Sequence, residues 1–132
     1  MIIVTGASRG LGRSVAERLI SSGREVLSLS RTSEGVPGDS VTCDVSDYEA
    51  VKAVAQSLRK EKREIEGLVN AAGIASMNLA VTTPPSMTQK LIQTNLAGTI
   101  HCCQLFAPLM IRKKAGSIIN FSTIAVTLGL KG

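Results

Sequence analysis

The first residues of the chain, Met1 to Gly12, have the sequence MIIVTGASRGLG and decide the fold. Their apolar run, Ile2 to Val4, has the length and composition of a buried parallel strand. It passes directly into a glycine-rich segment, and an amphipathic helical pattern follows. This order predicts a phosphate site, because glycines let the backbone approach a pyrophosphate and a helix N-terminus offers unpaired N–H groups. An ordinary glycine-rich turn remains the alternative.

The composition fits a domain in which helices cover a parallel sheet. With 132 residues, a single domain spanning residues 1–132 is expected. Hydrophobic residues make up 44% and aromatic residues only 2%, so the core must consist of Val, Ile, Leu and Ala. No apolar run is long enough to span a membrane, and a first strand at Ile2 leaves no room for a signal peptide.

The charge pattern and the cysteines bound the possible partners. The net charge is +5, but the charged run Arg59 to Glu64 mixes signs and has no interleaved aromatic residues, which favours a solvated surface over a nucleic-acid site. Cys43, Cys102 and Cys103 lack metal spacing and suit reduced, buried thiols in the cytoplasm. The only histidine, His101, is expected to be a packed or interface residue, and no metal site is predicted.

Strand and helix patterns alternate along the chain, which predicts a parallel, doubly wound sheet. Gly23 is the expected stop of the first helix. The predicted elements are a helix at Leu11–Ser22, a strand at Glu25–Ser30, a loop at Thr32–Asp39, a strand at Ser40–Cys43, a helix opened by a Ser46-x-x-Glu49 capping box, a strand at Gly67–Asn70, a long helix at about Ser86–Arg112 that contains Pro108, and a strand at Gly116–Phe121.

Three short motifs lie where these strands end. Ser30-Arg31 ends the second strand, Asp44-Val45 follows the third, and Asn70-Ala71-Ala72-Gly73 ends the fourth. Ligands of doubly wound sheets bind beyond the carboxyl ends of the strands, so these motifs are candidate ligand contacts. The alternatives are an exposed arginine, an acidic residue that caps a turn, and a strand end built from small residues.

The spacing of the motifs resembles that of the short-chain dehydrogenase/reductase family over the whole chain. The similar segments are the G-x3-G-x-G pattern of Gly6, Gly10 and Gly12, Asn70–Gly73, Thr94–Gly98 and Gly116–Thr123. The resemblance implies a Rossmann-type α/β fold, a three-layer αβα sandwich whose first half ends after the fifth strand. Among its subgroups, the sequence is most similar to NADPH-dependent 3-oxoacyl-[acyl-carrier-protein] reductases of fatty acid biosynthesis and to carbonyl reductases.

The resemblance implies NADP(H) as the cofactor. In the family, an Asp at the place of Asp44 accepts a hydrogen bond from the adenine amino group. An acidic residue near Ser30 would favour NAD, whereas Arg31 and Arg9 suit the 2′-phosphate of NADP(H). The expected cofactor-binding residues are Gly6, Ala7, Ser8, Arg9, Gly10, Leu11, Gly12, Arg31, Asp44, Val45, Asn70, Ala71, Ala72 and Gly73.

The catalytic residues that the resemblance implies are Asn95, which would hold a water in a proton relay, and Thr123, which takes the place of the serine that polarises the carbonyl. Ser122 precedes Thr123, and Gly129 supports this register. Threonine keeps the hydroxyl donor but is β-branched and restricted in rotamer.

The family's catalytic Tyr-x3-Lys would lie beyond Gly132, and neither Tyr48 nor Lys131 fits its position. The expectation is therefore an NADPH-dependent reductase of a small-molecule or acyl-carrier-linked carbonyl. The alternative is an inactive member that only binds NADP(H) or serves as an interaction partner. The 132-residue chain is expected to show no NADPH-dependent ketone reduction. A homo-oligomer is expected through the helix Ser86–Arg112, and the strand Ser117–Phe121 is expected to form an exposed edge.

Overall fold

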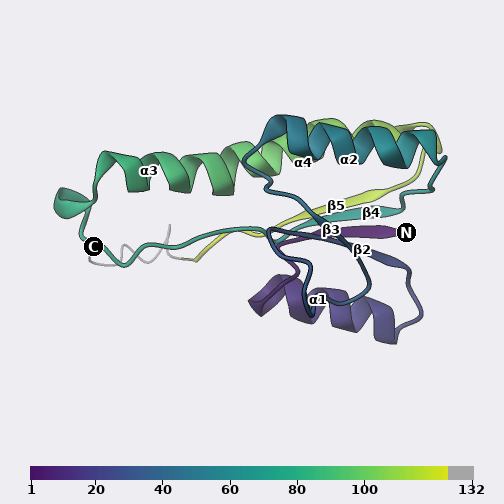
Figure 1. Cartoon of the computed structure of the whole chain (residues 1–132), viewed down its shortest axis with the longest axis horizontal. Coiled ribbons are helices and arrows are strands. Elements are labelled where there is room, and N and C mark those ends of the chain that lie inside the picture. The colour runs from purple at the N-terminus through teal and green to yellow at the C-terminus, as the bar shows by residue number, and fades with distance from the viewer. Residues whose placement is uncertain (125–132) are drawn as a thin grey trace.

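The computed structural model describes residues 1–124, which form five strands and a set of helices in alternation (Figure 1). The elements are β1 (Ile2–Thr5), α1 (Gly10–Ser21), β2 (Val26–Ser30), β3 (Asp39–Thr42), α2 (Tyr48–Lys60), β4 (Gly67–Asn70), the short 3₁₀ helix η1 (Ala80–Thr82), α3 (Pro85–Leu91), the π-helical segment η2 (Ile92–Ala97), α4 (Gly98–Ile111) and β5 (Ser117–Asn120). None of the described helices is long and apolar enough to cross a lipid bilayer.

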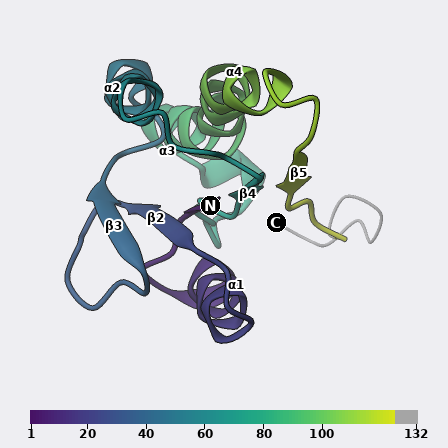
Figure 2. The ribbon, with the colours of Figure 1, turned by 90° about the vertical axis from the view of Figure 1, so that its right-hand side faces the viewer.

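All strands are parallel, in the order β3-β2-β1-β4-β5. The chain builds outward from β1 to β3 on one side and then returns to place β4 on the other side of β1. Helix α1 covers one face of the sheet, and α2 and α4 cover the opposite face (Figure 2). The predicted doubly wound, three-layer sheet is thus confirmed, with its switch point between β1 and β4.

Two apolar clusters hold the layers together. The larger lies between the sheet and helices α2 and α4, and its fully buried members include Ile3, Leu68 and Phe106. The smaller lies between the sheet and α1, around Val4 and Ala16. Adjacent residues of β1 therefore serve opposite faces, as alternation along a strand requires when both faces are covered.

The apolar residues of α1 and α2 recur at helical spacing, and most of these positions face the sheet. The stripe of α2, formed by Val51, Val54, Ala55 and Leu58, is buried as the spacing indicates. In α1, however, Leu11 is 66% exposed. The fully buried residues of α1 are Gly12 and Ala16, whose small size lets the start of the helix approach the strand ends closely, and the half-buried Val15 and Leu19 pack against the same cluster.

Helices α1 and α2 end in the same way with different residues. In both, the N–H of the residue after the left-handed one bonds to the carbonyl oxygen five residues earlier: Arg24 N to Leu19 O, and Arg63 N to Leu58 O. Gly23, with φ 78°, is the predicted stop of α1, whereas Lys62 adopts φ 56° at the same place after α2.

The predicted capping box of α2 is wrong. Asp47, not Ser46, caps the helix, and its side chain accepts hydrogen bonds from the N–H groups of Glu49 and Ala50 at 2.9 and 3.2 Å. The side chain of Ser46 instead donates to Asp44 at 2.7 Å. Both Ser46 and Asp47 are residue types that cap helices, and the local bond of Ser46 to Asp44 leaves Asp47 as the cap.

The long helix expected at Ser86–Arg112 is not a uniform α-helix. Helix α3 and helix α4 are joined end to end by η2, a π-helical turn that contains Thr94 and Asn95. Pro108 lies inside α4 as expected. Helix α3 extends beyond the end of the sheet (Figure 1).

Strand β5 forms an edge of the described sheet, as predicted. It pairs with β4 alone, and each of its residues is exposed. Ile118 and Ile119 are 39% and 53% exposed. An apolar edge strand of this kind offers unpaired backbone groups to another strand.

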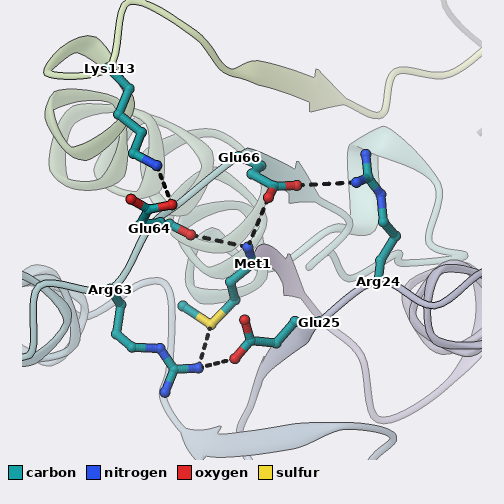
Figure 3. Close-up of polar contacts among 7 residues, drawn as sticks. All are labelled: Met1, Arg24, Glu25, Arg63, Glu64, Glu66 and Lys113. Atoms are coloured by element: carbon teal, nitrogen blue, oxygen red, sulfur yellow. Dashed lines mark hydrogen bonds and ion pairs between the residues drawn. The ribbon is translucent and has the colours of Figure 1, made fainter.

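The opposite, amino edge of the sheet is closed by a polar cluster that we call the amino-edge network (Figure 3). Its members are Met1, Arg24, Glu25, Arg63, Glu64, Glu66 and Lys113. The Met1 amino group donates to the Glu64 carbonyl oxygen at 3.0 Å, and Arg24 lies 3.4 Å from the Glu66 carboxylate. Arg63 pairs with Glu25, and Lys113 pairs with Glu64. The Lys113 ammonium holds the pKa of Glu64 below its usual range.

Candidate cofactor site

A cavity of about 270 Å³ lies at the carboxyl edge of the sheet, where the strand order reverses. We call it the carboxyl-edge cavity. It brings together segments that are far apart in the sequence, most of which end or follow a strand or begin a helix. The lining residues are Gly6, Ser8, Arg9, Gly10, Leu11, Gly12, Leu29, Ser30, Arg31, Cys43, Asp44, Val45, Ala71, Ala72, Gly73, Ile74 and Thr94.

The glycines of the first loop are needed for close backbone contacts. A Cβ on Gly12 would lie 2.4 Å from the Gly6 carbonyl oxygen, so the first turn of α1 packs directly on the loop. A Cβ on Gly6 would lie 2.7 Å from the Cα of Ala72, and Gly6 itself has φ 68°. The loop therefore packs against both its own helix and the segment after β4, which leaves the N-terminus of α1 open to the cavity.

Thr5 joins the two central strands, and sequence analysis assigned it no role. Its hydroxyl oxygen accepts hydrogen bonds from the N–H groups of Ala71 and Ala72, at 3.1 and 3.0 Å. The side chain is only 1% exposed. The Thr5 hydroxyl thus fixes the Asn70–Gly73 segment relative to the glycine-rich loop. A polar residue at the last position of an apolar strand was the signal available in the sequence.

Asn70 and Ala7 are the two predicted cofactor residues that do not line the cavity. The Asn70 amide donates to Asn120 Oδ1 at 2.8 Å and to Cys103 Sγ at 3.3 Å, so it braces β4 against β5 and α4. Asn70 Oδ1 is buried and receives no hydrogen bond from the described residues. Ala7 is fully buried in the cluster beneath α1.

Asp44 presents an ionised carboxylate to the cavity. One carboxylate oxygen accepts hydrogen bonds from the Ser46 N–H at 2.9 Å and from the Ser46 hydroxyl at 2.7 Å. These bonds, with a smaller contribution from the Arg31 charge, hold the pKa of Asp44 below its usual range. The second oxygen receives no hydrogen bond from the residues that the structure describes. It is therefore available to a donor in the cavity.

Two arginines give the cavity its charge. Arg9 precedes the first turn of α1, and Arg31 follows β2, and both line the cavity. Within residues 1–124, neither guanidinium has a hydrogen bond or an ion pair. The first turn of α1 contains no acidic residue. A helix N-terminus and two cations that form no ion pair with the described residues make this end of the cavity suitable for a multiply charged anion.

Asn95 connects the π-helical segment to the wall of the cavity. Its Oδ1 accepts the Ile74 N–H at 2.8 Å, and its Nδ2 donates to the Ile74 carbonyl at 2.9 Å. The Asn95 carbonyl accepts the Thr99 hydroxyl at 2.9 Å. The side chain therefore replaces a missing strand neighbour for Ile74, which lines the cavity next to Gly73.

The predicted carbonyl-polarising residues lie outside this lining. Ser122 and Thr123 follow β5 and do not line the carboxyl-edge cavity. Gly129 and Lys131, which the motif comparison used, lie outside the described residues. Thr94 does line the cavity. It belongs to the Thr94–Gly98 motif but is not among the expected cofactor-binding residues.

Tyr48 and Lys52 have the Tyr-x3-Lys spacing, a match that the sequence analysis missed. The Lys52 ammonium lies 5.8 Å from the centre of the Tyr48 ring. Both residues are in the first turns of α2, and neither lines the cavity. Their location, not their spacing, excludes them from the family's catalytic position.

The thiols of the two buried cysteines have raised pKa values and low reactivity. Cys43 lines the cavity, and burial, with the charges of Asp44 and Asp47, raises the pKa of its thiol to about 11. Burial, with Cys43 and Cys103 nearby, raises the pKa of Cys102 to about 12. All three cysteines are free, and Cys43 and Cys102 are buried as predicted while Cys103 is half-buried. Thiols at these pKa values stay protonated at neutral pH and do not act as nucleophiles.

Comparisons with known proteins agree with this geometry. The 3-oxoacyl-[acyl-carrier-protein] reductases of Salmonella typhimurium and Staphylococcus aureus are 30% and 32% identical over 98% of this chain, which covers 57% and 58% of their lengths. The ligand-free aldohexose dehydrogenase of Thermoplasma acidophilum is 37% identical with a TM-score of 0.87, over 92% of this chain and 48% of that chain. A closed serine dehydrogenase complexed with NADP⁺ is 28% identical with a TM-score of 0.91, over 99% and 57%.

The chain thus spans less than two thirds of the length of these relatives. The family model for short chain dehydrogenases matches residues 1–132. The glycine-rich loop, the switch-point cavity and the sequence identities point the same way, and the chain belongs to the short-chain dehydrogenase family of oxidoreductases.

Proposed function

We propose that the chain binds NADP(H) in the carboxyl-edge cavity and forms the cofactor-binding half of an enzyme that reduces a carbonyl to an alcohol. The observation that carries the proposal is the pair Arg9 and Arg31, two cations without an ionic partner among the described residues, in one cavity with a glycine-rich loop and a helix N-terminus. A 2′-phosphate would neutralise both guanidinium groups by charge-assisted hydrogen bonds.

The remaining lining accounts for the other parts of the cofactor. The N–H groups at the start of α1, beside Gly10 and Gly12, would bind the pyrophosphate. The second carboxylate oxygen of Asp44, next to Val45, would accept a hydrogen bond from the adenine amino group. The bound cofactor would supply the hydride, and this chain would hold and orient the cofactor.

The carbonyl chemistry rests on the resemblance of the segment after β5. Thr123 would donate its hydroxyl to the carbonyl oxygen, with Ser122 beside it, and Asn95 would hold the water of a proton relay. The similarity to 3-oxoacyl-[acyl-carrier-protein] reductases favours a 3-oxoacyl thioester or a similar ketone as the substrate. The free thiols suit a reducing compartment, and we place the protein in the cytoplasm.

A homo-oligomer is part of the same proposal. Apolar side chains are exposed along η2 and α4: Ile92 is 52% exposed, Leu96 57%, Ile100 43% and Ile111 70%. Exposed apolar residues on one continuous helical rod favour pairing with a second copy. Light scattering coupled to size exclusion is expected to give a mass at least twice 13.8 kDa, and a monomer at micromolar concentration would remove this part.

Calorimetry with NADPH and NADH tests the cofactor. The wild-type chain should bind NADPH more tightly, and Arg9→Gln with Arg31→Gln should weaken NADPH by about 10-fold or more while leaving NADH unchanged. Arg18→Gln removes the same charge from α1 outside the cavity and is the control. Equal affinity of the wild type for both cofactors would remove the roles of Arg9 and Arg31.

The second candidate is a family member that binds NADP(H) without turning over a substrate. It is favoured by the observation that the one Tyr-x3-Lys pair in residues 1–124, Tyr48 and Lys52, does not line the cavity. Under it, the 132-residue chain binds NADPH but oxidises none of it in the presence of ketones. NADPH-dependent turnover that persists through repeated purification would exclude this candidate.

A further inference from the structure

His101 does not line the carboxyl-edge cavity but bonds to Val45, a residue of its wall on the β3 side. Its Nδ1 lies 3.0 Å from the carbonyl oxygen of Val45, a residue that is 6% exposed and lines the cavity. A carbonyl oxygen only accepts hydrogen bonds, so Nδ1 carries the hydrogen and donates it. The cavity wall beside Asp44 is thereby bonded to helix α4.

The contact is reinforced on both sides of His101. One turn earlier in α4, a Cβ on Gly98 would lie 2.7 Å from Val45 Cγ2 and 3.2 Å from the Val45 carbonyl oxygen, so the backbone of α4 packs directly on Val45. On the other side, the Tyr48 ring meets the imidazole edge to face, with ring centres 5.3 Å apart at 81°. The imidazole thus lies between the Tyr48 ring of α2 and the Val45 carbonyl oxygen.

The continuous helix formed by η2 and α4 also fixes the wall of the cavity on the β4 side. Asn95, in η2, bonds to both backbone polar groups of Ile74. Asn95 and His101 therefore fix opposite parts of one cavity, Ile74 on the β4 side and Val45 on the β3 side. Of these two contacts, the one made by His101 is on the side where Asp44 and Arg31 lie.

We infer that His101 is a positioning residue for the adenine end of the site: it fixes the Asp44–Ser46 loop through the Val45 carbonyl, so that the Asp44 carboxylate meets the adenine amino group in a preset geometry. The inference rests on the proposed binding of NADP(H). It assigns His101 to orientation of the loop, without contact with the cofactor, since His101 does not line the cavity.

Two substitutions separate the hydrogen bond from packing. His101→Phe keeps a ring against Tyr48 but removes the donor, whereas His101→Asn loses the ring but places an N–H donor near the Nδ1 position. Binding is measured by calorimetry with NADPH, with adenosine 2′,5′-bisphosphate as the adenine-end fragment, and with nicotinamide mononucleotide as the other end. Amide hydrogen exchange at Val45 and Ser46 reports the loop without any ligand.

We expect His101→Phe to weaken NADPH and adenosine bisphosphate by the same factor, about 3- to 10-fold, as for one lost hydrogen bond. Nicotinamide mononucleotide affinity should not change, and exchange in the loop should accelerate. His101→Asn should restore both wild-type affinities. Unchanged adenosine bisphosphate binding in His101→Phe, or equal weakening in both variants, would overturn the inference alone. If the wild-type chain binds neither NADPH nor adenosine bisphosphate, the proposed function fails, and this inference with it.

Discussion

At the amino edge of the sheet, the cations of Arg24, Arg63 and Lys113 each face a carboxylate (Figure 3), whereas at the carboxyl edge Arg9 and Arg31 face a cavity. The two edges are built from the ends of the same five strands. The difference is that one edge satisfies its charges within the chain and the other leaves them for a ligand. Neutralised charge contributes to stability, and unneutralised charge contributes to binding.

Backbone direction explains why the cavity is at the carboxyl edge. Each helix that follows a strand begins there, so the unpaired N–H groups and the positive end of α1 add to Arg9 and Arg31. At the amino edge the helices end, and the chain turns back through Lys62 and Gly23 into ion pairs. Changes at the two edges should therefore have separable effects on ligand binding and on folding.

The largest effect is expected from Gly12→Ala, at the carboxyl edge. The new Cβ would lie 2.4 Å from the Gly6 carbonyl oxygen, a backbone atom that cannot move without displacing the loop. NADPH affinity should fall by about 100-fold or more, and the free energy of unfolding by about 1–3 kcal/mol. Calorimetry and urea denaturation measure the two quantities.

Gly35→Ala is the control for adding a Cβ without a new contact, because Gly35 has a positive φ, 63°, and a Cβ there meets nothing within 4 Å. It should cost no more than about 1 kcal/mol of stability and leave NADPH affinity unchanged. Equal loss of affinity in both variants would show that the close contact between the loop and helix α1 does not govern the site.

Thr5→Val should have the next largest effect, on stability at the carboxyl edge. Valine has nearly the same shape but leaves the half-buried N–H groups of Ala71 and Ala72 without their acceptor. The free energy of unfolding should fall by about 2–4 kcal/mol. Thr5→Ser keeps the hydroxyl and should cost less than half as much. A valine variant that is as stable as the wild type would show that these hydrogen bonds do not contribute to stability.

Lys62→Gly should stabilise the chain at the amino edge. Lys62 has φ 56° at the end of α2, where Gly23 has φ 78° after α1 with the same pair of capping hydrogen bonds. A side chain in this conformation is strained, so glycine should raise the free energy of unfolding by about 0.5–1 kcal/mol. The reverse change, Gly23→Lys, should lower it by a similar amount. A neutral result in urea denaturation for both would show that the two caps are not strained.

The sequence predicts the carboxyl edge well because its determinants are local. The order strand, glycine loop and helix at Ile2–Gly12 specifies the loop, and a single strand direction brings Arg31 and Asp44 to the same edge. What it does not predict depends on tertiary contacts. The π-helical turn at Asn95 satisfies Ile74, and no side-chain periodicity encodes it. The capping of α2 by Asp47 is a local choice that the pattern also leaves open, because Ser46 and Asp47 are both capping residue types and Ser46 bonds to Asp44 instead.

The amino-edge network also depends on tertiary contacts, so the sequence does not predict it. Its pairs join residues that are distant in the chain, as Lys113 and Glu64 or Arg63 and Glu25 are, and charge spacing along one helix does not reveal them. The predicted solvated face at Arg59–Glu64 is correct for most of its residues, but Arg63 and Glu64 have partners across the edge. The roles of Ser122 and Thr123 stay predictions.

The smallest effect is expected from Glu66→Gln, which tests whether the amino edge contributes to folding alone. The Glu66 carboxylate lies 3.4 Å from the Arg24 guanidinium and 3.7 Å from the Met1 amino group, and its side chain is 51% exposed. Exposed ion pairs are weak and screened by salt, so the variant should lose about 0.5 kcal/mol of stability at low salt and nothing in 1 M NaCl. NADPH affinity should be unchanged at both salt concentrations, because no charge at the carboxyl edge has been altered. A shift in NADPH affinity would mean that the two edges are coupled through the strands, and the separation of folding charge from binding charge would not hold.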